Sequence, residues 1–251
     1  MDERELLSKR FRELANKSYN SGIYIFTDFL GLAEQAVFNE AKSTFYGVKY
    51  TEFGGAVGAE RKIVRFGDEE CLGYTENFPI VCIKAEPVSQ KFADKLTHRD
   101  FLGAILNLGI ERSKLGDIPI IDNVGYIFAK EEIAPFIMAE LRKVKHTDMK
   151  LSIIDTLPEG ELYKTERRKI QAASERIDAV VARVFNLSRE ESKSLFLKRL
   201  VFADGKLCEN TSYIPKENEV ISVRGHGRFI YLGYETTTRK GKLNIEVEVY
   251  V

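Results

Sequence analysis

The sequence has few cysteines, no long apolar run and no net charge. Its three cysteines, Cys71, Cys82 and Cys208, are an odd number without CxxC spacing, which argues against a disulfide framework and a structural zinc site. We therefore expect all three to be small buried side chains. Apolar runs such as FPIVCI are far shorter than the roughly 20 residues that cross a bilayer. The first residues also lack the apolar segment of a secretory signal, so we expect a soluble, cytoplasmic protein without membrane contact.

The net charge of zero hides an uneven distribution. Residues 161–251 hold 17 Lys and Arg against 13 Asp and Glu, whereas residues 1–160 hold 21 against 25. The last third therefore carries four surplus positive charges and the rest carries four surplus negative ones. Because the distribution of charge says more about a polyanionic partner than its sum, the neutral total does not exclude a nucleic acid.

The pattern of apolar residues indicates an α+β protein of several parts. Helical spacing over residues 3–17 and 32–42 precedes two strand-like runs that flank a glycine-rich loop at residues 54–60. From residue 78 the order becomes β-α-β-β-α-β, with a capping box TxxD at the start of its first helix. We predict a helical and hairpin N-terminal region (1–75), a ferredoxin-like, RRM-like middle domain (76–157), a charged linker helix (158–173) and a C-terminal domain with a terminal β-hairpin (174–251).

The candidate binding surface lies in the C-terminal domain. A helix over IDAVVARV has one apolar stripe, and Arg176 and Arg183 share a neighbouring stripe that stays exposed. The next helix begins with Ser188 as N-cap. The unpaired backbone amides at its start lie beside Arg189 and Lys193, so that the amides and both cations can bind one anion. The strand VISVRGHGRF then brings in two arginines and a histidine, although a solvated tight turn explains this stretch about equally well.

We predict that these cations converge on one surface that fits the phosphates of a structured RNA. The predicted surface consists of Arg176, Arg183, Ser188, Arg189, Lys193, Lys198, Arg199, Lys206, Arg224, His226 and Arg228.

Several stretches resemble a known family. RIDAVVARVFNLSREESKSLF, VFADGKL and EVISVRGHGRF resemble the S4-type RNA-binding domain, also called the alpha-L motif, over about residues 174–233. FGGAVGAER, LGIERSKLGDI, SERIDAV and TTRKGK resemble the YlmH family along nearly the whole chain. The resemblance implies binding of ribosomal RNA or transfer RNA on the large ribosomal subunit in the rescue of stalled translation. Arg199 stands where the motif usually has glycine, which puts the tight turn there in doubt.

Secondary RNA contacts are predicted outside this surface. The glycine-rich loop has backbone amides and nearby cations that suit phosphate, but a plain hairpin connection is as good an explanation. In the middle domain two aromatic residues share one strand face, where RNA-recognition sheets stack bases, although such pairs are more often core. The basic loop at residues 112–117 and the basic hairpin turn at residues 239–242 are also candidate phosphate contacts, and solvated turns explain both as well. The predicted contacts are Arg61, Lys62, Arg112, Lys114, Tyr126, Phe128, Arg239, Lys240 and Lys242.

Other functions remain as alternatives. S4-type domains are often joined to RNA-modifying enzymes, but the chain has no cofactor loop, no HIGH-like or KMSKS-like pair and no GRLD segment. Its three histidines are scattered, and no catalytic set can be assembled from them. We therefore predict no catalytic residues, no cofactor and no metal. A pseudouridine synthase or methyltransferase is the first alternative, and a protein-interaction factor linked to cell division is the second.

Overall fold

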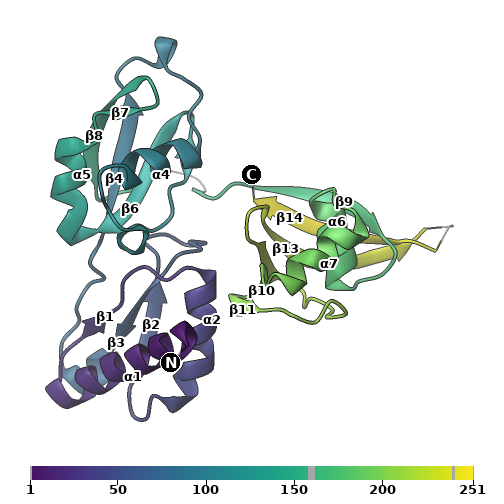
Figure 1. The fold of residues 1–251 in the computed structure, drawn as a ribbon, viewed down its shortest axis with the longest axis horizontal. Coiled ribbons are helices and arrows are strands. Elements are labelled where there is room, and N and C mark those ends of the chain that lie inside the picture. Colours follow the sequence, from purple (N-terminus) through teal and green to yellow (C-terminus); the bar gives the residue numbers. More distant parts are fainter. Residues whose placement is uncertain (1, 158–161, 239–240, 251) are drawn as a thin grey trace. The chain divides into compact units, whose positions relative to one another are not determined.

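Helices and antiparallel sheets alternate along the chain, which confirms the α+β class. The computed structural model describes residues 2–157, 162–238 and 241–250. The chain divides into an N-terminal unit, Met1–Leu162, and a C-terminal unit, Tyr163–Val251 (Figure 1). Within the described residues, no helix combines the length and the apolarity that a membrane span requires.

The first part of the N-terminal unit packs two helices against a small sheet. Its elements are α1 (Glu3–Ser21), β1 (Ile25–Phe26), α2 (Leu32–Ala41), the 3-10 turn η1 (Lys42–Thr44), β2 (Tyr50–Phe53), β3 (Ile63–Phe66) and α3 (Glu69–Leu72). The strand order is β1-β3-β2, and both pairs are antiparallel. Phe11 of α1, Phe38 of α2 and Phe66 of β3 are buried in one core. Both predicted helices and the predicted hairpin are present.

The second part of the N-terminal unit contains a five-stranded sheet. Its elements are β4 (Ile80–Pro87), η2 (Gln90–Phe92), α4 (His98–Leu106), η3 (Arg112–Lys114), β5 (Ile120–Ile121), β6 (Val124–Lys130), η4 (Glu131–Ile133), α5 (Ala134–Glu140), β7 (Lys143–Val144) and β8 (Thr147–Ile154). The strand order is β5-β6-β4-β8-β7, and neighbouring strands are antiparallel. Phe101 of α4 and Ile137 of α5 are buried against one face of the sheet. The predicted capping box is formed, since the Thr97 amide donates to Asp100 Oδ2 at 2.7 Å.

The C-terminal unit is one six-stranded sheet with two helices packed on one face. Its elements are β9 (Thr165–Ala172), α6 (Ile177–Val184), α7 (Arg189–Leu197), β10 (Val201–Ala203), β11 (Lys206–Leu207), β12 (Glu219–Val223), β13 (Gly227–Thr237) and β14 (Leu243–Tyr250). The strand order is β11-β10-β12-β13-β14-β9. The apolar stripe of α6, with Val180 and Val181, is buried against Phe229 of β13 and Val247 of β14.

The predicted linker helix over residues 158–173 is wrong. Residues 158–161 lie outside the described part, and residues 165–172 form β9, which pairs with β14 along its full length. Arg167 and Lys169 on β9 contact Glu246 on β14 at 2.5 Å and 3.2 Å. The sequence of β9 does not alternate between apolar and charged residues, because its charged side chains find their partners on a strand about 80 residues away. A search for hydrophobic alternation therefore could not recognise it as a strand.

The expectation for the cysteines is correct for two of the three. Cys82 and Cys208 are buried, but Cys71 is exposed on the single turn of α3. There its thiol donates to Asp68, and this hydrogen bond raises the pKa of Cys71. The single turn of α3 has four residues and leaves this side chain at the surface, which explains the difference.

Candidate RNA-binding surface

Two groups of cations in the C-terminal unit differ in their partners, those on β9 and six that belong to the predicted surface. The arginines and lysine of β9 are all paired with glutamates: Arg167 and Lys169 with Glu246, and Arg168 with Glu166. The second group is exposed, and within the described residues its side chains make no hydrogen bond or ion pair. It consists of Arg183, Arg189, Lys193, Lys198, Lys206 and Arg224. All six belong to the surface predicted from the sequence, and they lie on α6, α7, β11 and the connections that follow α7 and β12.

The start of α7 is formed by the predicted capping box. The Ser188 hydroxyl accepts from the Glu191 amide at 3.2 Å, and the Ser188 amide donates to Glu191 Oε2 at 2.7 Å. These hydrogen bonds from Ser188 hold the pKa of Glu191 below its ordinary value. Ser188 therefore acts as a cap within the fold, and Arg189 and Lys193 follow it on the exposed side of the helix.

Arg176 is fixed at the start of α6. Its Nε and Nη2 donate to the two oxygens of Asp178 at 3.1 Å and 2.9 Å, and the Asp178 side chain is only 1% exposed. The Ser192 hydroxyl donates to the backbone oxygen of Asp178 at 2.7 Å, which ties α7 to α6. Asp178 thus has a structural role, and Arg176 is less available to a ligand than Arg183.

The turn between β12 and β13 lies beside both helices. The Arg224 amide donates to Leu200 O, just after α7, at 2.9 Å. The His226 ring lies 5.8 Å from the ring of Phe185 at the end of α6. The charge of His226 also contributes to the lowered pKa of Glu191, which places it near the start of α7. Arg224 and His226 are therefore brought to the side of the sheet that carries the helices.

The tight turn after α7 is retained although Arg199 replaces the usual glycine. Arg199 takes the left-handed conformation, with φ of 58°. Its amide donates to Phe196 O at 2.9 Å, and the Leu200 amide donates to Leu195 O at 2.9 Å, which closes the helix end. The guanidinium lies 3.5 Å from Glu209, so this cation is partly neutralised.

Arg228 does not lie with the other predicted cations. Side chains alternate along β13, and the next residue, Phe229, is buried under the helices. Arg228 therefore points to the opposite face, where it stacks 3.9 Å from the Tyr250 ring centroid and 4.9 Å from that of Tyr163. The prediction that it joins Arg224 and His226 on one surface is corrected for this reason.

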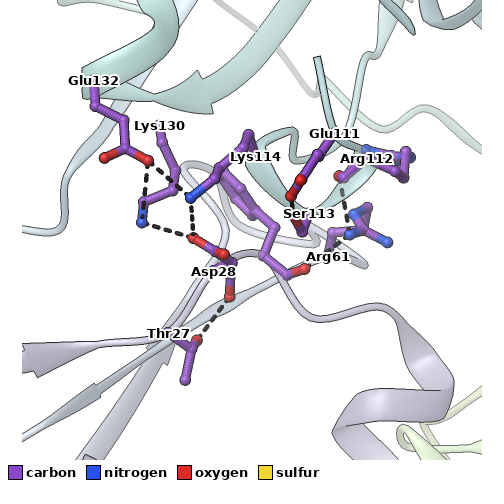
Figure 2. Close-up of polar contacts among 10 residues, drawn as sticks. Thr27, Asp28, Arg61, Glu111, Arg112, Ser113, Lys114, Lys130 and Glu132 are labelled. Atoms are coloured by element: carbon purple, nitrogen blue, oxygen red, sulfur yellow. Dashed lines mark hydrogen bonds and ion pairs between the residues drawn. The ribbon is translucent and has the colours of Figure 1, made fainter. Parts of the chain in front are cut away.

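Three of the predicted secondary contacts form the joint between the two parts of the N-terminal unit (Figure 2). Arg61 donates to Phe29 O at 2.8 Å, Leu115 O at 2.9 Å and Arg112 O at 3.3 Å. Arg112 Nη1 donates to Leu115 O at 2.7 Å and Gly116 O at 3.0 Å. Burial and the neighbouring Arg61 lower the pKa of Arg112 to about 10, so Arg112 stays charged at neutral pH.

Lys114 also belongs to this joint. It pairs with Asp28 at 3.1 Å and with Glu132 at 3.0 Å, and Lys130 pairs with the same Asp28 oxygen at 2.8 Å (Figure 2). Of the cations near the glycine-rich loop, Lys62 alone has a side chain without a hydrogen bond or ion pair among the described residues. The loops that carry these cations thus hold the N-terminal unit together.

The glycines of the loop at residues 54–60 serve close packing. A Cβ on Gly54 would lie 2.4 Å from Arg61 O, and one on Gly55 would lie 2.3 Å from the Phe128 ring. Phe128 packs under Gly55 and is 1% exposed, and Tyr126 on the same strand is 7% exposed. The prediction of base stacking on these two rings is corrected, because neither presents an open ring face.

Sequence reasoning missed the acids of the joint, Asp28 and Asp117. Asp117 accepts from the amides of Glu60 at 2.6 Å and Arg61 at 3.2 Å, which fixes the glycine-rich loop against the middle domain. Asp117 stands in LGIERSKLGDI, so the motif itself pointed to the right stretch. Arg239 and Lys240 lie outside the described residues, and Lys242 is exposed beside them. No group of three or more His, Cys, Asp or Glu in the described part is arranged to hold a metal ion.

Comparisons with known proteins agree with the sequence motifs. Residues 74–157 match the family model described as "Putative RNA-binding domain in YlmH". The ribosome-associated protein quality control protein P2 of Bacillus subtilis (strain 168) is 28% identical over 257 residues, which cover 98% of this chain and 95% of that protein. The cell division protein ylmH from Streptococcus pneumoniae aligns with a TM-score of 0.49 and 23% identity over 61% of this chain and 92% of that chain. The family model and the Bacillus relative confirm the resemblance to the YlmH family, and residues 74–157 are the part that matches its RNA-binding domain.

Proposed function

We propose that this chain is a non-catalytic RNA-binding protein that acts on the ribosome. The observation that carries the proposal is the group of exposed cations without acidic partners on α6, α7 and the turn before β13. In the same unit the cations of β9 are paired with glutamates. Unpaired cations that share one region repel one another, and phosphates of a bound RNA relieve that repulsion.

The finer assignment follows the resemblance and the comparisons. We propose that residues 174–251 act as an S4-type domain and that the middle domain has the ferredoxin-like arrangement, with β7 as an added edge strand. The name of the Bacillus relative supports a role in ribosome-associated quality control. We place this role in the cytoplasm. Ribosomal RNA and transfer RNA on the large subunit are the proposed targets.

The test is the salt dependence of RNA binding by the full chain. Each neutralised phosphate contributes about 0.7–0.9 log units of affinity per log unit of salt, so Arg189→Gln with Arg224→Gln should lower the slope by about 1.4–1.8. The matched control, Lys164→Gln with Lys216→Gln, removes the same charge from exposed positions outside the predicted surface. Equal slopes for the two double variants on purified large-subunit ribosomal RNA would contradict the proposal.

The absence of catalysis is tested separately. The full chain is incubated with transfer RNA and ribosomal RNA, and the nucleosides are analysed by mass spectrometry. We expect unaltered nucleosides, and a modified one would replace the proposal by the enzyme alternative.

A further inference from the structure

The sheet of the middle domain leaves little room for RNA on the face away from its helices. Phe128 and Tyr126 are buried there, and Cys82 on the neighbouring strand β4 is 6% exposed. Further along β4, Lys84 contacts Glu86 at 2.7 Å. The two rings that an RNA-recognition sheet would use for base stacking are therefore covered on this face.

A cleft of about 440 Å³ lies where α1 and β1 meet the ends of β4 and β6. It joins the first part of the unit to the region that matches the RNA-binding domain. Its lining residues are Arg10, Leu14, Lys17, Tyr24, Ile25, Phe26, Pro79, Lys130 and Glu132. Three of these carry positive charge and one carries negative charge.

Two of the three cations lie on α1 and are available to a ligand. Arg10 and Lys17 are seven residues apart, which places them on the same side of the helix and about 10 Å apart along its axis. Both are exposed, and neither side chain forms a hydrogen bond or ion pair with the part of the chain that the structure describes. Leu14 lies between them and lines the cleft.

The third cation, Lys130, lies at the end of β6 and is held there by two acidic side chains. Its side chain is 14% exposed, and its ammonium lies 2.8 Å from Asp28 and 3.6 Å from Glu132 (Figure 2). These acids fix its position in the joint, and their negative charges offset its positive charge. The cleft thus has one positioned ammonium and two unpaired cations, beside an apolar wall that includes Phe26 and Pro79.

We propose that this cleft is a second RNA contact, in which Arg10 and Lys17 bind backbone phosphates and the apolar wall contacts the sugar or base of the same strand. The inference rests on the proposed function, since it assumes that RNA is the partner of the C-terminal unit. Unpaired cations beside an apolar wall suit a single-stranded or frayed segment, because such a segment offers both charge and ring faces.

The experiment measures binding of the full chain to purified large-subunit ribosomal RNA across a salt series. Arg10→Gln with Lys17→Gln should lower the salt slope by about 1.4–1.8, as two lost phosphate contacts require. Arg12→Gln with Lys95→Gln is the matched control, because it removes the same charge from two exposed positions outside the cleft whose side chains make no ion pair among the described residues. Ultraviolet crosslinking with peptide mapping should also place RNA on the peptide that contains Phe26 and lose that crosslink in the cleft variant.

The outcomes separate the two proposals. If the cleft variant keeps the slope of its control while Arg189→Gln with Arg224→Gln lowers it, the cleft proposal fails and the proposed function stands. If neither pair changes the slope, both fail. An unchanged slope together with binding of an acidic peptide to the cleft would also overturn the proposal, since it would identify a protein partner.

Discussion

Replacing Arg61 with alanine should loosen the N-terminal unit more than its partial exposure suggests. The guanidinium donates to three backbone oxygens, two of them on residues that are fully buried, Phe29 and Leu115. These oxygens lie on two separate stretches of the chain, one before α2 and one before β5. The side chain therefore joins the first part of the unit to the middle domain.

The size of the effect follows from which oxygens lose their donor. Leu115 O keeps Arg112 Nη1 at 2.7 Å, whereas Phe29 O has no other donor among the described residues. A hydrogen bond from a charged group contributes about 1.5–3 kcal/mol, and an orphaned buried oxygen costs a similar amount. Adding a smaller loss at the other two oxygens, we expect Arg61→Ala to lower the free energy of unfolding by about 2–4 kcal/mol.

Hydrogen exchange in increasing urea measures this effect, because peptides from the C-terminal unit provide an internal reference. Lys62→Ala is the control, since its side chain has no polar partner in the described residues, and it should change the free energy by less than about 0.5 kcal/mol. Arg61→Lys should lie between the two, because lysine keeps the charge but not the planar fork. If Arg61→Ala and Lys62→Ala unfold alike, the joint does not depend on this side chain.

Three further results are expected. Ser188→Ala should destabilise the C-terminal unit by about 1 kcal/mol in urea unfolding, because α7 loses its cap; an unchanged midpoint would count against this. Arg199→Gly should raise the melting temperature, since it removes a left-handed non-glycine residue at a cost of about 1 kcal/mol; a lower one would show that the pair with Glu209 matters more. Burial raises the pKa of Asp28, but hydrogen bonds from Lys130 and Lys114 outweigh it and lower the pKa overall. The joint should therefore be stabilised at neutral pH and weaken below about pH 4, and Asp28→Asn should remove this dependence of the unfolding midpoint.

Local signals in the sequence predicted local structure well. The capping boxes at Thr97 and Ser188 are formed. Each depends on residues only a few positions apart, so a single sequence contains the whole pattern.

Features that depend on distant partners could not be predicted in this way. Residues 165–172 have the composition of a solvated helix, and they form β9 only because β14 supplies both backbone partners and glutamates. The glycine-rich loop resembles a phosphate site, but its Gly55 accommodates Phe128, more than 70 residues away. Arg228 is different, because the alternation with the neighbouring Phe229 already indicated that the two face opposite ways.

The arrangement of β9 also bears on how this protein can be shortened. β9 covers the long strand β14, whose Ile245, Val247 and Val249 belong to the core. A fragment that begins at residue 174 would leave β14 paired with β13 on one side only, so that its other side becomes an apolar edge open to strand addition and aggregation. β9 itself is rich in charge, and the opposite edge strand, β11, has only two residues. The intact sheet thus has no long apolar edge within its described residues, and a workable fragment has to begin before Thr165.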